Sequence, residues 1–246
     1  MIEDSRFAQV HPRWMSAEIL PGLRQRHSQA VILRGPEQWK TGRFSSLLSA
    51  EPPIYLLSLP DSEEEEITVS EDMLRPPTWW LTGLSGSGKT TIARSAEQRL
   101  REMNVPCVVL DEDEMRKGLC SDLGYLAGQQ IELIRRAAET AKLFASHGIL
   151  PIVTGISPWS SERLFARKLL GDDFREIFVQ APFEMCVQRD PKGLYARARS
   201  GSVRDFPGWS VGYEVPEEPD LIVDTAECNV EECVERLLGL EAGLNS

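Results

Sequence analysis

Residues 78–90 read Thr-Trp-Trp-Leu-Thr-Gly-Leu-Ser-Gly-Ser-Gly-Lys-Thr, an apolar run that leads into a glycine-rich segment. The segment matches the pattern G-x-x-x-x-G-K-[ST] at every defined position: Gly83, Leu84, Ser85, Gly86, Ser87, Gly88, Lys89 and Thr90. The glycines permit a loop whose N–H groups point inward around an anion, and a helix that begins near Lys89 adds its positive dipole end. We therefore predict a P-loop that binds the phosphates of ATP, with Thr91 next to it.

Side chains in and after this loop supply the expected chemistry. Lys89 places a charge on the β- and γ-phosphates, and the Thr90 hydroxyl is the expected Mg²⁺ ligand. Val108-Val109-Leu110 runs into Asp111-Glu112-Asp113, and carboxylates at the carboxyl end of a parallel strand face the ligand-binding edge of an open α/β sheet. Such carboxylates can hold Mg²⁺ or accept a proton from an attacking hydroxyl. Strand alternation would point Asp111 and Asp113 the same way, with Glu112 opposite.

Strands and helices alternate after residue 77. Strands are expected at 78–82, 107–110, 149–154, 176–179 and 221–224, and helices at 89–103, 130–146, 161–170 and 231–238. This order predicts an α/β fold of the P-loop NTPase class, with a parallel sheet covered by helices on both faces. A P-loop beside a carboxylate that can accept the proton of an attacking hydroxyl is typical of a kinase, so we call residues 78–246 the kinase domain.

An acidic and proline-rich segment precedes the kinase domain. Residues 61–66 read DSEEEE and Pro76-Pro77 follow, a composition that favours a linker at 61–77. An acidic loop within one domain is the alternative. Residues 1–60 contain two apolar stretches, at 30–33 and 54–59, that predict short strands in a small N-terminal module. That module has no chemical motif, and it would pack against the kinase domain or a partner protein.

Charge and cysteine content narrow the class of protein. The formal net charge of −11 argues against a nucleic-acid binder and against docking on an anionic membrane. The five cysteines form no C-x-x-C pair, which is typical of reduced, buried thiols. With no signal pattern at the N-terminus and no apolar run long enough to span a membrane, we expect a cytoplasmic protein.

Several motifs together resemble one family. GLSGSGKT, LDEDEMRKGLCSDLGY, IRRAAETAKLFASHGI, ISPW, LLGDDF and RDPKGLYARARSG occur in the order found in the adenylylsulfate (APS) kinases, over about residues 79–225. The resemblance implies a kinase that moves the γ-phosphoryl group of ATP to the 3′-hydroxyl of adenylylsulfate in sulfate assimilation. It also implies a mobile lid, here about residues 190–216, and leaves open a homodimer.

The same resemblance assigns roles to individual residues. Asp111 and Asp113 correspond to the family's acidic pair for Mg²⁺ and the hydroxyl proton, Arg189 to the residue that packs on the adenine of ATP, and Ser157 to a serine sometimes assigned as a phosphoserine intermediate. We favour direct in-line transfer instead, because bound Mg·ATP beside a hydroxyl needs no covalent relay. The expected acceptor-binding residues are Arg116, Tyr125, Gln130, Ile156, Ser157, Lys192, Arg204 and Phe206.

The chain departs from the family pattern mainly on the acceptor side. The departures are Glu112 for glycine, Gln130 for arginine, Leu133 for asparagine, Gly155 for an aromatic residue, Ser160 for arginine, and Ser210 and Gly212 for Asp and Pro. Losing a charge-assisted bond to an anionic oxygen costs about 1.5–3 kcal/mol. Adenylylsulfate is therefore the leading acceptor, with another nucleotide conjugate such as cytidine diphosphoramidate, or a small hydroxyl acceptor, as the alternative. A non-catalytic ATP-binding module is the second alternative.

Overall fold

The computed structural model describes residues 30–34, 39–50, 53–58, 66–70, 76–103, 105–124, 126–203 and 205–243. These residues form two separate sheets, one of four strands and one of five. Each sheet belongs to a different part of the chain, and the five-stranded sheet carries the predicted P-loop.

The four-stranded sheet is antiparallel and lies in the N-terminal part of the chain. Its strands pair in the order β1 (Ala30–Arg34), β2 (Trp39–Ala50), β3 (Pro53–Ser58) and β4 (Glu66–Ser70). The two strands predicted at 30–33 and 54–59 are confirmed as β1 and β3.

The predicted linker at 61–77 is wrong where it includes β4. That strand pairs with β3 from Glu66 opposite Ser58 to Ser70 opposite Ile54. Its centre, Ile67-Thr68-Val69, is β-branched and favours an extended backbone. The acidic block thus ends where a strand begins, and the division into an N-terminal module and a kinase domain stays a prediction.

The five-stranded sheet is parallel throughout, as the alternating pattern predicts. Its strands are β5 (Thr78–Thr82), β6 (Cys107–Asp111), β7 (Leu150–Thr154), β8 (Phe174–Gln180) and β9 (Leu221–Asp224). They lie in the order β6-β7-β5-β8-β9. All five predicted strands are confirmed, and their ends shift by at most one or two residues. Because the strands are parallel, their carboxyl ends share one edge of the sheet.

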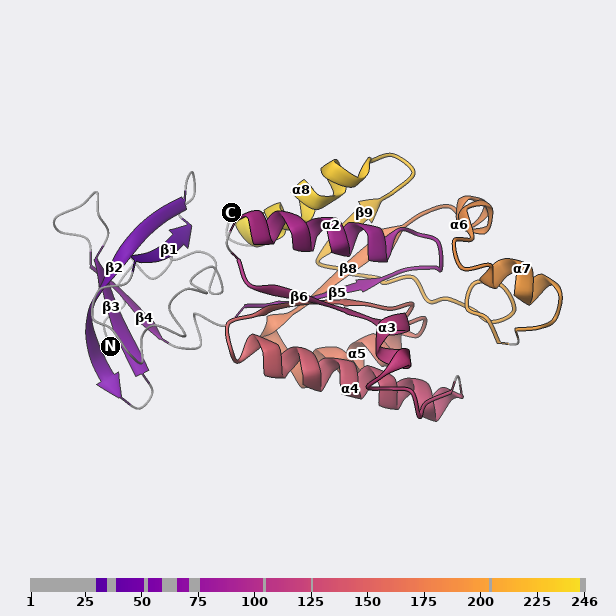
Figure 1. The fold of residues 1–246 in the computed structure, drawn as a ribbon, viewed down its shortest axis with the longest axis horizontal. Coiled ribbons are helices and arrows are strands. Elements are labelled where there is room, and N and C mark those ends of the chain that lie inside the picture. The colour runs from indigo at the N-terminus through magenta and orange to yellow at the C-terminus, as the bar shows by residue number, and fades with distance from the viewer. Residues whose placement is uncertain are drawn as a thin grey trace.

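Two pairs of helices cover the two faces of this sheet (Figure 1). On one face lie α2 (Lys89–Glu102) and α8 (Val230–Gly243), and on the other lie α4 (Ala127–Ala145) and α5 (Ser160–Leu170). The neighbouring residues Trp79 and Trp80 are both buried but join different clusters, Trp79 with α2 and α8 and Trp80 with α4 and α5. This division follows from strand alternation, and it explains why two consecutive tryptophans fit in the core.

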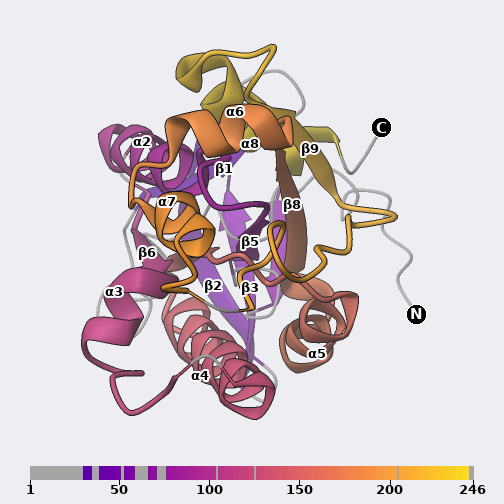
Figure 2. The ribbon, with the colours of Figure 1, turned by 90° about the vertical axis from the view of Figure 1, so that its right-hand side faces the viewer.

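Three short helices that the sequence did not predict lie near the carboxyl edge of the sheet: α3 (Glu112–Lys117), α6 (Phe183–Arg189) and α7 (Leu194–Arg199). Figure 2 looks onto this end of the molecule, where α6 and α7 lie in front of the strands. A single 3-10 turn, η3 (Gly171–Asp173), joins α5 to β8.

The described residues also bear on the expectations about membrane-spanning segments and cysteines. In that part of the chain, no helix combines the length and the apolar character needed to cross a membrane. All five cysteines are free, and all except the half-buried Cys228 are buried, as expected for reduced thiols.

Candidate active site

The glycine-rich segment forms a tight loop between β5 and α2, at the carboxyl edge of the sheet. Gly83 and Gly86 have φ values of +149° and +79°. A Cβ atom at these positions would lie 2.4 Å from the Val179 carbonyl oxygen and 2.7 Å from that of Cys186. Both positions therefore need glycine, for backbone conformation and for space.

The loop is built to receive an anion. Lys89 Nζ donates to the carbonyl oxygens of Gly83 and Leu84 at 2.8 and 2.7 Å, so the ammonium group lies over the loop. Burial, followed by the positive charge of Lys192, lowers the pKa of Lys89 to about 8. Ser87 Oγ is buried and, within the described residues, has no hydrogen-bond partner. A triphosphate would supply the negative charge and the acceptors that these groups lack.

A carboxylate lies directly beside the loop. Asp111 Oδ2 accepts hydrogen bonds from the hydroxyls of Thr90 at 2.8 Å and Thr154 at 2.7 Å. Burial alone would raise the pKa of Asp111, but the bonds from Thr154 and Thr90 outweigh it, and the pKa lies below its usual value. Asp111 is thus ionised at neutral pH, and its oxygen and that of Thr90 converge as hard ligands for Mg²⁺.

The predicted alternation of Asp111 and Asp113 is wrong, because the chain becomes helical at Glu112. Asp111 caps α3 instead, and its Oδ1 accepts from the backbone N–H groups of Asp113 at 3.0 Å and Glu114 at 3.4 Å. Asp113 is half exposed and forms a close ion pair with Lys192, from the predicted lid. The two aspartates therefore differ: one is fixed beside Thr90, and the other faces the lid.

Glu112 points inward and joins several predicted acceptor-binding residues. Its Oε1 accepts from Arg116 Nη2 at 2.9 Å, Arg116 Nε at 3.1 Å and Gln130 Nε2 at 3.4 Å. Its Oε2 accepts from the backbone N–H of Ile156 at 3.2 Å. Arg116 Nη2 also donates to Gln130 Oε1 at 2.7 Å. The structure thus brings Arg116, Gln130 and Ile156 together around one carboxylate.

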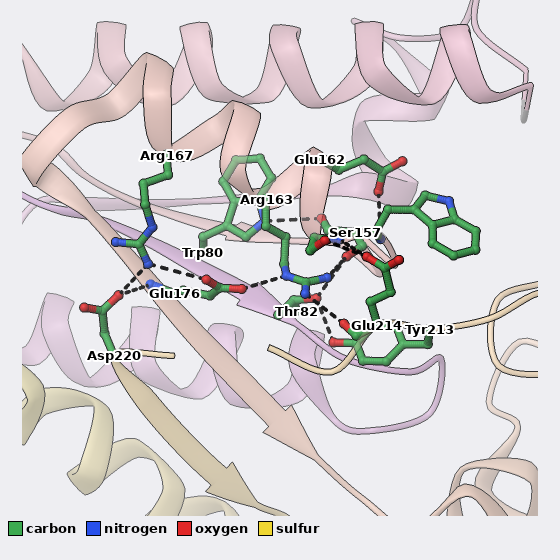
Figure 3. Close-up of polar contacts among 12 residues, drawn as sticks. Trp80, Thr82, Ser157, Glu162, Arg163, Arg167, Glu176, Tyr213, Glu214 and Asp220 are labelled. Atoms are coloured by element: carbon green, nitrogen blue, oxygen red, sulfur yellow. Dashed lines mark hydrogen bonds and ion pairs between the residues drawn. The ribbon is translucent and has the colours of Figure 1, made fainter. Parts of the chain in front are cut away.

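Ser157 is the predicted site residue that fits least well with its assigned role. It is fully buried, and its Oγ accepts from the Trp80 indole N–H at 3.2 Å. Its φ of +41° and its carbonyl bond from Arg163 Nη1 at 2.8 Å fix the loop after β7 (Figure 3). A buried hydroxyl held by an indole is poorly placed to attack a phosphate, which argues for a positioning role.

The predicted lid contains ordered structure that contacts the P-loop. Arg189 donates to the Gly86 carbonyl at 3.3 Å and to Thr225 Oγ1 at 2.9 Å, which places the predicted adenine-packing residue at the loop. Tyr195, on α7, donates its hydroxyl to the Ser85 carbonyl at 3.0 Å. Phe206 is buried against Tyr195 with ring centroids 5.0 Å apart, in an apolar cluster that also packs against Leu84 and Ile156, so its role toward an acceptor stays a prediction.

Four further positions complete the account of the predictions. Tyr125 and Arg204 lie outside the described residues. Leu133 is buried in an apolar cluster with residues of α3, α4 and α5, which explains why an apolar side chain stands there. Thr91 is exposed on α2, next to Thr90.

The sequence reasoning missed several residues that shape the site. They are Thr154 on Asp111, Tyr195 on the P-loop and Arg163 behind Ser157. Only Thr154, a hydroxyl residue at the end of a predicted parallel strand, carried a signal that could have identified it.

Comparisons with known proteins agree with this geometry. A family model described as adenylylsulphate kinase matches residues 75–224. The chain belongs to this family. An adenylyl-sulfate kinase of Clostridium acetobutylicum is 48% identical over 159 residues, which cover 65% of this chain and 80% of that protein. One from Marinobacter nauticus is 46% identical over 165 residues, covering 67% and 83%.

A solved structure of the same family is also similar to this chain in its fold. The Mycobacterium tuberculosis APS kinase CysC in complex with AMPPNP and APS is 39% identical, with a TM-score of 0.66. The match covers 70% of this chain and 99% of that one. The matched family domain is therefore nearly complete in this chain.

Proposed function

We propose that this protein is an adenylylsulfate kinase, which transfers the γ-phosphoryl group of ATP to the 3′-hydroxyl of adenylylsulfate and so serves sulfate assimilation. One observation carries the proposal. In a chain of this family, the Thr90 hydroxyl and the Asp111 carboxylate meet at 2.8 Å at the end of a complete P-loop. Such an arrangement suits phosphoryl transfer from a nucleotide triphosphate.

Thr90 and Asp111 would hold Mg²⁺. Within the described residues no group of three or more His, Cys, Asp or Glu side chains gathers into a metal site. This fits Mg²⁺, which is commonly bound by one or two protein oxygens together with phosphates and water. When bound, Mg²⁺ would neutralise charge on the β- and γ-phosphate oxygens.

The remaining roles follow from what each side chain contacts. Lys89 would exchange its loop carbonyls for phosphate oxygens, and the P-loop N–H groups would orient the triphosphate. Asp113 would accept the proton of the acceptor hydroxyl, once Lys192 gives up its pairing with that carboxylate. Transfer would be direct, since Ser157 is buried.

A specific observation favours a second candidate, a kinase for another nucleotide conjugate. Arg116, the expected acceptor-binding arginine, is paired with Glu112, so the acceptor side carries less positive charge than the family pattern implies. An acceptor whose terminal group can donate a hydrogen bond to the Glu112 carboxylate, such as the amide of cytidine diphosphoramidate, would suit that site. The homodimer, the cytoplasmic location and a partner for the N-terminal module stay predictions.

A coupled ADP-release assay tests the function. With Mg·ATP and adenylylsulfate we expect turnover, and Lys89→Ala should abolish it. Lys142→Ala, which removes an exposed lysine from α4, is the matched control and should keep full activity. Release of ADP only with other nucleotides would select the second candidate. Firm Mg·ATP binding without turnover on any acceptor would indicate a non-catalytic module and refute both.

A further inference from the structure

The Glu112 carboxylate is surrounded by donors of the kind that bind anionic ligands. Arg116 contributes two N–H groups at 2.9 and 3.1 Å, Gln130 its amide at 3.4 Å, and Ile156 its backbone N–H at 3.2 Å. These donors come from three parts of the chain: α3, α4 and the loop after β7. A guanidinium, an amide and a main-chain N–H that converge on one point form an anion-binding subsite, and here the chain's own side chain fills it.

Gly155 makes room for this carboxylate. A Cβ atom at position 155 would lie 3.1 Å from Glu112 Oε2, closer than side-chain carbons normally approach an oxygen. An aromatic residue at 155 would therefore displace Glu112 from its present position. The presence of glycine here and glutamate at 112 is consistent with a carboxylate that belongs in this pocket.

The pocket lies next to the reacting groups. Glu112 is flanked in the chain by Asp111, which bonds Thr90, and by Asp113, which pairs with Lys192. Its charge also reaches the P-loop: burial is the main influence on the pKa of Lys89, and the Glu112 carboxylate is one of the charges that oppose it. An anion in this subsite would therefore sit beside the site of phosphoryl transfer, where an acceptor substrate must lie.

We propose that Glu112 occupies the subsite for the acceptor's anionic group, and that an acceptor must displace this carboxylate in order to bind. Assigning the anion to an acceptor rests on the proposed kinase function. The subsite itself rests only on the donors around Glu112. Glu112 then acts as a specificity determinant, which weakens the binding of strongly anionic acceptors and favours acceptors with less charge.

Glu112 could instead hold Arg116 in position for the substrate, and this role predicts a change in KM of the opposite sign. If the carboxylate only holds Arg116 in position for the substrate, removing it should weaken acceptor binding. If it occupies the subsite, removing it should strengthen binding, because Arg116, Gln130 and Ile156 become available to the incoming anion. The sign of the change in KM therefore separates the two roles.

The first measurement is steady-state kinetics with adenylylsulfate. For Glu112→Gly we expect KM for adenylylsulfate to fall at least tenfold, while kcat changes less than about threefold. Glu112→Gln removes the charge but keeps the length of the side chain, and its KM should lie between the values for the wild type and Glu112→Gly. The matched control is Glu114→Gly, which removes an exposed carboxylate that pairs with Lys117 at the surface of the same turn of α3. Its KM should equal that of the wild type.

A binding measurement keeps the inference separate from the kinase function. Thermal unfolding is followed with increasing sodium sulfate, at an ionic strength kept constant with sodium chloride. Glu112→Gly should bind sulfate at least tenfold more tightly than the wild type, and the double variant Glu112→Gly/Arg116→Met should lose this gain. The double variant also lacks the Glu112 charge, so comparing it with Glu112→Gly corrects for any change in sulfate binding at the P-loop.

The outcomes are distinct. A KM that rises or stays constant in Glu112→Gly, or sulfate binding that does not change, would overturn the inference. If Glu112→Gly gains sulfate binding but neither the wild type nor any variant uses adenylylsulfate, the subsite is supported and the proposed substrate is refuted. Activity with adenylylsulfate that appears only in Glu112→Gly would show directly that this carboxylate restricts the acceptor.

Discussion

Replacing Arg163 by methionine tests how the loop around Ser157 is held. Arg163 is 3% exposed and donates to Glu176 Oε1 at 2.6 Å, to the Ser157 carbonyl at 2.8 Å and to the Glu214 carbonyl at 2.8 Å (Figure 3). Methionine fills a similar length but leaves the Glu176 carboxylate without its buried partner. Breaking a buried ion pair from one side costs about 3–5 kcal/mol, because the remaining charge stays desolvated.

A matched control comes from the same network. Arg167 also pairs with Glu176, at 3.4 Å, and with Asp220 at 3.3 Å, but it is 38% exposed. Solvent weakens such pairs, and Arg167 also stacks over Phe174, so Arg167→Met should cost only about 1 kcal/mol. Both arginines contact the Glu176 carboxylate, so the difference between the variants reports the burial of Arg163 together with its two bonds to carbonyl oxygens.

The assay is urea unfolding followed by tryptophan fluorescence, to which the buried Trp79 and Trp80 contribute. Adding Glu176→Gln to Arg163→Met should recover part of the loss, because the unpaired charge is then removed. Equal losses for Arg163→Met and Arg167→Met, or a loss below about 1 kcal/mol for the first, would refute the assignment of Arg163 as the buried anchor of this loop.

Three other expectations concern single side chains. Burial raises the pKa of Glu162 from 4.5 to about 7, so this carboxyl group loses its proton at lower pH in the unfolded chain than in the folded one. The free energy of unfolding should therefore fall as pH rises from about 4.5 to 7, by at most about 3 kcal/mol. Glu162→Gln should flatten this dependence in urea unfolding between pH 5 and 8, and an unchanged slope would contradict the assignment. Asp113→Asn should lower kcat with little effect on KM, with Glu114→Gln as control, whereas a change confined to KM would assign Asp113 to binding. Tyr195→Phe removes the bond to the Ser85 carbonyl, worth about 0.5–1.5 kcal/mol, and should raise KM for ATP about two- to tenfold; an unchanged KM would mean that α7 does not support the P-loop.

The strands and long helices of the kinase domain could be predicted from the sequence because their signals are local. Each strand of the parallel sheet is a short apolar run, and α2 and α4 have helical apolar spacing over several turns. The short helix α3 was missed because strand alternation was continued past Asp111, whereas the Asp111 side chain caps a helix there. A cap consists of one or two local hydrogen bonds, and it leaves no periodic pattern in the sequence.

The residues of the candidate site also divide into those with a local signal in the sequence and those without one. The P-loop could be predicted because eight consecutive residues carry its chemistry. The contacts of Glu112 could not, since Ile156 lies 44 residues away, nor could the bond between Trp80 and Ser157, which are 77 residues apart. Such contacts depend on strand order, and β7 lies between β6 and β5 only in the folded sheet.

Two departures from the family pattern, Glu112 and Gly155, are coupled in the structure. Glu112 and Gly155 share one space, since a side chain at 155 would meet the carboxylate at 3.1 Å. Ser160 donates through both its N–H and its hydroxyl to Glu214 Oε2, at 2.7 and 2.6 Å, so a neutral residue there binds the carboxylate that follows Tyr213. Counting each departure as an independent loss of substrate contacts would therefore overstate the change. At positions 112 and 155 the chain has exchanged one compatible pair of residues for another, and the exchange adds a negative charge beside Arg116.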